Sequence, residues 1–212
     1  MLVAGVTGGV ATGKSLVTRG LRGHGAVTFS ADEAARAVLS PHGETISSIR
    51  AAFGDAVFRE DGALDRRALA AVVFRSPEAL QLLSRVTHPP ILRMLRAQID
   101  GAAYDMAPAT VIVVEAPLLF EAGLERWFDF IVVVACSSNF QLARAMARDA
   151  ITSEEAAKRI ESQWPLREKS RLADLTIHNN LLEDTERQIV ILWRRLARLA
   201  VERAGPVYAR EP

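Results

Sequence analysis

The run GGVATGKS at residues 8–15 constrains the fold more than any other part of the sequence. It matches the pattern G-x-x-x-x-G-K-[ST] through Gly8, Gly13, Lys14 and Ser15. An apolar segment, LVAGV, precedes it and a helix-compatible segment, SLVTRGLRGHG, follows it. Glycines let the backbone turn so that N–H groups face phosphate oxygens, and the helix adds the positive end of its dipole. The sequence therefore predicts a strand, a loop and a helix that bind a nucleoside triphosphate. We expect contacts from the whole loop: Gly8, Gly9, Val10, Ala11, Thr12, Gly13, Lys14 and Ser15.

Three polar residues carry the expected chemistry of this loop. Lys14 places a point charge on the β- and γ-phosphates, and the Ser15 hydroxyl ligates Mg²⁺. The apolar run VIVVE ends in Glu115, an acid that suits holding Mg²⁺ through water; the alternative is a strand that happens to end in glutamate. The sequence has no Asn-Lys pair of the guanine-recognition motif N-K-x-D, which disfavours a GTPase.

Composition excludes several classes of protein. Half of the 212 residues are hydrophobic and the formal net charge is +1, so neither disorder nor strong binding to nucleic acid or an anionic membrane is expected. One cysteine, Cys136, allows no intrachain disulfide and no multi-cysteine zinc site, and its position after an apolar run favours a small core residue. The start of the chain lacks the features of a signal peptide, and no apolar run approaches the roughly 20 residues of a membrane span. We expect a cytoplasmic protein whose partners are small molecules.

Five short runs rich in β-branched residues predict strands. Runs such as FIVVV have no polar alternation, which indicates strands buried on both faces of a parallel α/β sheet. The predicted strands are Leu2–Val6, Ala26–Phe29, Val111–Val114, Phe130–Ala135 and Leu175–Ile177.

Helical patterns fill the long segment between the second and third predicted strands. They predict an inserted helical subdomain, with helices at Glu33–Leu39, Thr45–Phe53, Arg66–Phe74, Pro77–Val86 and Pro90–Gly101. A second, Arg-rich insert covers Ser137–Arg171. A last long helix is expected to begin at Asp184 as N-cap and to stop at Gly205 and Pro206.

Asp32 lies just after the second predicted strand, in TFSADEAAR. The carboxyl ends of parallel strands surround the ligand crevice, so this carboxylate suits accepting the proton of an attacking hydroxyl. The local pattern supports a helix N-cap equally well, because EAARAVL follows.

Taken together, these segments resemble the dephospho-CoA kinase family over nearly the whole chain. The phosphate-binding loop at residues 8–15, the P-loop, is shared with many enzymes, but the ordered set of motifs is specific to this family. The segments that carry the resemblance are TGGVATGKS, SADEAAR, DGALDRRALAAVVF, the pair His88-Pro89, EAPLLFEAGLE, QLARAMARD and ADLTIHNN.

The resemblance implies a P-loop kinase fold: a five-stranded parallel sheet flanked by helices, with a helical substrate-binding insert and a lid. It implies transfer of the ATP γ-phosphate to the ribose 3′-hydroxyl of dephospho-CoA, with Asp32 as the base. On this basis we expect a single kinase domain. Its nucleotide-binding core would be residues 1–31, 107–136 and 172–212, its CoA-binding insert 32–106 and its lid 137–171.

The resemblance also assigns roles outside the P-loop. Arg144 and Arg148, four apart on one helical face, would meet the phosphates from the lid; without the resemblance, a solvated charged face is the expected interpretation. Arg66, His88 and Glu121 would lie in or near the substrate pocket, although His88 taken alone suits a structural histidine. Asn179 would border the adenine.

Four positions depart from the family pattern. Ser30 stands where the family has an Asp, which removes a charge near the metal. Ala11 replaces a frequent loop glycine, and we expect little effect because a negative φ would accommodate it. Ala150 and His178 also differ from the common Gly and Asp. Another small-molecule kinase, such as a nucleoside monophosphate kinase, and a non-catalytic nucleotide-binding module remain the alternatives.

Overall fold

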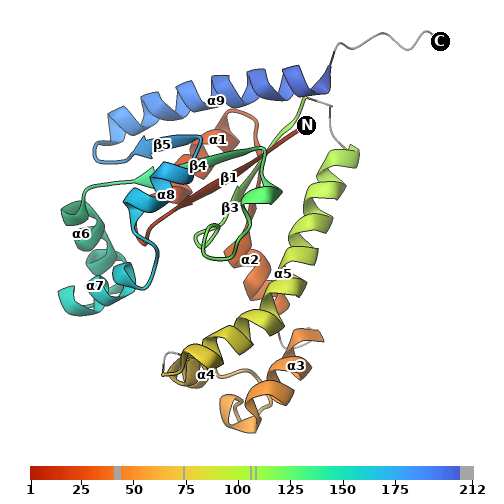
Figure 1. The fold of residues 1–212 in the computed structure, drawn as a ribbon, viewed down its shortest axis with the longest axis vertical. Coiled ribbons are helices and arrows are strands. Elements are labelled where there is room, and N and C mark those ends of the chain that lie inside the picture. The colour runs from red at the N-terminus through yellow and green to blue at the C-terminus, as the bar shows by residue number, and fades with distance from the viewer. Residues whose placement is uncertain (41–43, 74, 106, 108, 206–212) are drawn as a thin grey trace. The chain divides into compact units, whose positions relative to one another are not determined.

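A computed structural model describes residues 1–40, 44–73, 75–105, 107 and 109–205, and it contains a five-stranded parallel sheet (Figure 1). The strand order is β2-β3-β1-β4-β5, so the strand that precedes the P-loop lies in the centre. The predicted sheet is confirmed. Its strands are β1 (Leu2–Gly8), β2 (Val27–Ser30), β3 (Val111–Glu115), β4 (Phe130–Ala135) and β5 (Leu175–His178).

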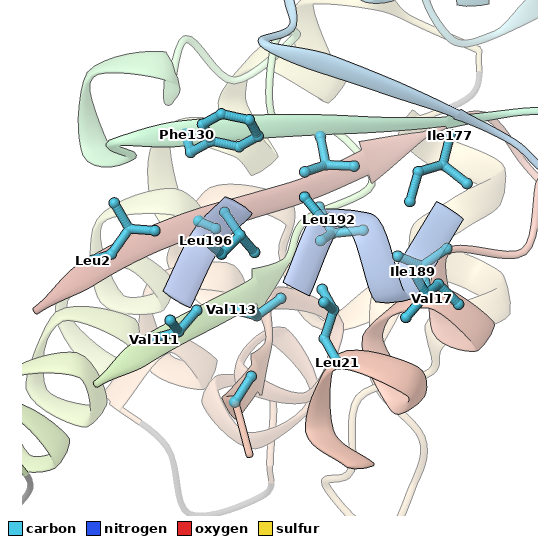
Figure 2. Packing of buried hydrophobic residues seen from close by; sticks show 14 of the residues in the cluster. Leu2, Val17, Leu21, Val111, Val113, Phe130, Ile177, Ile189, Leu192 and Leu196 are labelled. Atoms are coloured by element: carbon cyan, nitrogen blue, oxygen red, sulfur yellow. The ribbon is translucent and has the colours of Figure 1, made fainter. Parts of the chain in front are cut away.

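One face of the sheet packs against α1 (Lys14–Gly23) and α9 (Leu182–Ala204). Alternate residues of the strands point into this layer, where they meet Leu21, Leu192 and Leu196, all fully buried (Figure 2). Burying a side chain of this size stabilises the fold by about 1.5–3 kcal/mol. The P-loop is therefore anchored at both ends, by a central strand and by a helix of the main core.

The opposite face of the sheet is covered just as closely. A Cβ on Gly5 would meet Leu119 Cδ1 at 2.6 Å and Phe128 Cγ at 2.9 Å, so β1 needs glycine there. The short helix η2 (Glu125–Trp127) leads into β4, and α6 (Ser138–Asp149), α7 (Ser153–Glu161) and α8 (Leu166–Leu172) follow it. Burial on both faces explains the unbroken apolar runs in the sequence.

The last helix differs from the prediction at its start. It begins at Leu182, with Leu181 as N-cap, so the expected N-cap at Asp184 is wrong. Asp184 lies in the first turn instead, where a carboxylate still opposes the positive end of the helix dipole. Gly205 ends the helix with φ 70°, as predicted.

The described residues form two compact units, 1–30 with 101–212 and 31–100. The second contains α2 (Ala31–Val38), α3 (Glu44–Phe53), the short helix η1 (Asp55–Val57), α4 (Arg66–Val73) and the first part of α5 (Pro77–Asp105). It has a core of its own, formed by Ile49, Val57, Leu64, Leu69 and Val73. The assignment of 32–106 to CoA binding and of 137–171 to a lid stays a prediction.

Helix α5 differs from the prediction of two separate helices, Pro77–Val86 and Pro90–Gly101. Both Pro89 and Pro90 lie inside one continuous helix. Proline removes a backbone donor, but its fixed φ is that of a helix, and strong helix formers such as Leu92, Arg93 and Met94 follow the pair. No helix among the described residues is long and apolar enough to cross a membrane.

Candidate active site

The loop that follows β1 has the shape expected of a phosphate cradle. Gly8 (φ 149°) ends the strand, and Gly13 (φ 93°) is the N-cap of α1 in the left-handed region. A Cβ on Gly8 would overlap the Val134 carbonyl, and one on Gly13 would overlap the Asn179 amide. These two glycines are therefore required by both conformation and space.

Two amide side chains hold the loop at residues 8–15 by donating hydrogen bonds to its backbone carbonyls. Asn179 Nδ2 donates to the Thr12 carbonyl at 2.8 Å, and Gln141 Nε2 donates to the Val10 carbonyl at 2.9 Å. Thr185 Oγ1 in turn donates to Asn179 Oδ1 at 3.0 Å. Asn179 was expected at the adenine; its side chain is buried under the loop, and its role at the base stays a prediction. The sequence did not single out Gln141, because its role depends on a contact with the Val10 carbonyl that forms only in the folded chain.

The entrance to α1 favours an anion. Gly13 has no side chain to cap the helix, and the first turn contains no acidic residue, so no side chain of α1 itself compensates the positive end of the dipole. The Lys14 ammonium bends back over the loop and donates to the Gly9 carbonyl at 2.7 Å. Ala11 has φ 56°, so the expectation of a negative φ there is wrong, and the loop holds an alanine in a glycine-like conformation.

The two residues predicted to hold Mg²⁺ meet, although 100 positions separate them. Ser15 Oγ donates to Glu115 Oε1 at 2.9 Å, at the end of β3. Ser30, the position where the family has an Asp, is paired with Glu115 in the parallel register of β2 and β3. Hydroxyl and carboxylate oxygens are the hard donors that Mg²⁺ prefers, so these residues fit the ion. No group of three or more His, Cys, Asp or Glu suited to a metal occurs in the described ranges.

Comparison with known proteins decides the family. The sequence profile described as dephospho-CoA kinase matches residues 2–184. The chain belongs to the dephospho-CoA kinase family. A dephospho-CoA kinase of Syntrophotalea carbinolica is 44% identical over 197 residues, which cover 92% of each chain. A solved Thermus thermophilus structure has a TM-score of 0.80 at 33% identity, with 92% of this chain and 97% of that one covered. A solved dephospho-CoA kinase from Campylobacter jejuni has a TM-score of 0.69 at 27% identity, with 94% and 98% covered. The fold is that of P-loop kinases.

The two arginines expected in the lid of this kinase have different surroundings. Arg144 is half-buried and donates to the Asn179 carbonyl at 2.8 Å, which places it beside the residue that supports the P-loop. Arg148 is exposed and forms a bidentate pair with Asp149, with distances of 2.8 and 2.9 Å. This hydrogen bonding raises the pKa of Arg148 and lowers that of Asp149. The pair uses Nε and Nη2 of Arg148, so the Nη1 donors could still meet a phosphate.

Asp32 lies in the first turn of α2, two residues after β2 ends at Ser30, and its side chain is exposed. Because α2 begins at Ala31, the alternative interpretation of Asp32 as the N-cap is wrong. The interpretation as the catalytic base stays open.

The remaining predicted substrate residues lie in different settings. Arg66 is the exposed first residue of α4, directly after Asp65, which accepts from the backbone N–H groups of Arg67 and Ala68. Those bonds hold the pKa of Asp65 below its usual value. His88 is exposed on α5, so it is not enclosed in a core. Their roles stay predictions.

Glu121 is held by a residue that the sequence analysis did not assign. Lys169, in α8, is fully buried and pairs with Glu121 Oε1 at 2.7 Å. The one feature of the sequence that distinguishes Lys169 is its residue type, since only three of the 26 basic residues are lysine. Cys136 is buried, which raises the pKa of its thiol and confirms the prediction of a core residue.

Proposed function

We infer that this chain phosphorylates the ribose 3′-hydroxyl of dephospho-CoA with ATP, giving CoA and ADP, the last step of coenzyme A biosynthesis. The observation that carries this conclusion is the match to dephospho-CoA kinases over 92% of the chain, in a fold that keeps the P-loop intact. The acceptor and the donor are small molecules. A cytoplasmic location stays a prediction from the sequence.

The reaction needs charge stabilisation and a proton acceptor. The 3′-oxygen forms a bond to the γ-phosphorus, the bond from that phosphorus to the β,γ-bridging oxygen breaks, and ADP leaves. Lys14 and the N-terminus of α1 stabilise the phosphate charge, and Ser15 and Glu115 would hold Mg²⁺, the latter through water. The ion would neutralise charge on the β- and γ-phosphates. Asp32 takes the proton of the hydroxyl as the new bond forms.

The other predicted residues serve binding. Arg144 and Arg148 would add charge to the phosphates after closure of the 137–171 segment, and Arg66, His88 and Glu121 would contact dephospho-CoA. The half-buried position of Arg144 next to Asn179 supports the first assignment. The buried oxygen of Glu121 that lacks a hydrogen-bond partner in the described part of the chain supports the last.

A coupled assay of ADP release tests this function against its alternatives. ATP and Mg²⁺ are held constant while dephospho-CoA, AMP, CMP and UMP are offered in turn. We expect ADP release above the acceptor-free rate with dephospho-CoA alone. Faster release with a nucleoside monophosphate would identify a nucleoside monophosphate kinase. Nucleotide binding without turnover of any acceptor would identify a non-catalytic module.

A further inference from the structure

Lys169 is the most enclosed charged side chain of the described residues, with an exposed fraction of 0%. Its Nζ forms an ion pair with Glu121 Oε1 at 2.7 Å and donates a hydrogen bond to the Pro117 carbonyl at 3.2 Å. Burying an ammonium is costly unless acceptors surround it. Lys158 forms a pair of the same length with Glu154, but on the surface, where such pairs contribute little. The enclosed pair is therefore the one in which removal of a partner has large consequences.

The Pro117 carbonyl accepts hydrogen bonds from two other segments of the chain, β1 and α8. Thr7 Oγ1, one residue before the P-loop, also donates to it at 3.2 Å. The preceding residue, Ala116, donates its backbone N–H to the Val6 carbonyl at 3.0 Å. Lys169 thus connects α8 to the segment after β3, at a residue two positions beyond Glu115, where that strand ends. This segment is the first part of the motif EAPLLFEAGLE.

The two oxygens of the Glu121 carboxylate differ in their contacts. Oε1 forms the ion pair with Lys169 and accepts a hydrogen bond from the backbone N–H of Trp164 at 3.0 Å. Oε2 is buried and has no hydrogen-bond partner among the residues described. An unpaired buried acceptor is costly, and the cost is recovered when a ligand supplies a donor. The ion pair with Lys169 and the hydrogen bond from Trp164 therefore fix the carboxylate and leave its second oxygen for a hydroxyl or amide N–H.

We propose that Lys169 is a positioning residue for the phosphate acceptor: it fixes Glu121 so that Oε2 accepts a hydrogen bond from an O–H or N–H group of the acceptor substrate. This inference rests on the proposed function, because it takes the acceptor to be dephospho-CoA. The P-loop has hydrogen bonds of its own from Asn179 and Gln141, which donate to the Thr12 and Val10 carbonyls. Loss of Lys169 should therefore weaken binding of the acceptor and not that of ATP.

The test compares Lys169→Met with Lys158→Met, which removes the matched surface ammonium. Steady-state kinetics give the KM of each substrate, and isothermal titration calorimetry gives its Kd without turnover. We expect Lys169→Met to raise the KM and the Kd for dephospho-CoA about tenfold or more, the loss of one hydrogen bond to a charged group. The Kd for ATP should stay within about twofold. Lys158→Met should leave all values unchanged. An equal loss of affinity for ATP, or no loss for either substrate, would overturn the proposal.

A second set of variants keeps the test decisive if Lys169→Met folds poorly. Glu121→Gln retains the shape of the side chain and removes its charge, and it should raise the KM for dephospho-CoA with little effect on kcat. If Lys169 acts through Glu121, the double variant raises this KM no further than the worse single variant. If the two single substitutions raise the KM for dephospho-CoA by factors that multiply in the double variant, the proposal is contradicted. The wild-type protein separates the two hypotheses, because failure to use dephospho-CoA refutes the function, whichever way the variants behave.

Discussion

Replacing Asn179 should loosen the P-loop without touching its sequence. The side chain is 4% exposed and donates to the Thr12 carbonyl at 2.8 Å. Asn179→Ala leaves that carbonyl buried without its donor, a cost of about 1–3 kcal/mol, and a small cavity adds to it. Thr185 loses less, because its hydroxyl also lies 2.8 Å from the Leu181 carbonyl. We expect about 2–3 kcal/mol of lost stability, which in a chain of this size lowers Tm by about 5–10 °C.

The neighbouring Asn180→Ala is a matched control. Asn180 is exposed and accepts only the Ser137 backbone N–H within the described chain, so its loss should cost about 1 kcal/mol or less. Asn179→Asp is the stringent case, because a carboxylate oxygen would face the Thr12 carbonyl. Its deficit should shrink at acid pH, where a protonated carboxyl can donate in place of the amide.

The affinity assay separates support of the loop from contact with adenine. Titration with ATP and with inorganic tripolyphosphate reports on the base and on the phosphates separately. If Asn179 supports the loop, Asn179→Ala should lower the affinity for ATP and for tripolyphosphate by similar factors. If ATP alone is weakened, Asn179 contacts the adenine. If stability and both affinities match those of Asn180→Ala, the reasoning from burial and hydrogen bonding is refuted.

Other predictions follow from the same geometry. Asp32→Asn should lower kcat by about 10²–10⁴ with ATP affinity intact, the size of effect expected for a general base; an unchanged kcat removes it from the mechanism. Ala150, the C-cap of α6, has φ 50° and ψ 46°, so Ala150→Gly should raise the free energy of unfolding by up to about 1 kcal/mol in urea titrations, and a loss would contradict the inferred strain. Ser30→Asp places a second carboxylate beside Glu115 and should lower the Mg²⁺ concentration for half-maximal activity, with a higher one as the contrary result. Asp65 has a lowered pKa, so its contribution to stability is complete above its ordinary pKa of about 3.9 and is lost as pH falls through its lower folded value. Asp65→Asn should therefore flatten the dependence of the free energy of unfolding on pH in that window. An unchanged slope would assign acid unfolding to other groups.

Much of the nucleotide site was predictable because it depends on local sequence. The P-loop needs its glycines where the backbone turns, and the apolar runs β1 and β3 must be buried strands. Parallel strands bring their carboxyl ends to one edge, so Ser15 and Glu115 could be placed together before the structure showed their 2.9 Å hydrogen bond.

The errors concern properties that a single sequence does not encode locally. The positive φ of Ala11 is imposed by the rest of the loop, against the preference of the residue. Pro89 and Pro90 predict a helix boundary, yet α5 continues through both of them. The positions of Asn179 and Lys169 depend on which carbonyl or carboxylate lies opposite after folding, and neither spacing nor composition contains that information.

Delivery of the γ-phosphate to one particular alcohol is the central step of the proposed reaction. Phosphorus NMR of the products formed from ATP and dephospho-CoA measures this directly. We expect ADP and a new phosphomonoester on the ribose 3′-oxygen in equal amounts, with both absent in Lys14→Ala. A phosphate on another hydroxyl, or ADP formed without any phosphorylated acceptor, would contradict the account.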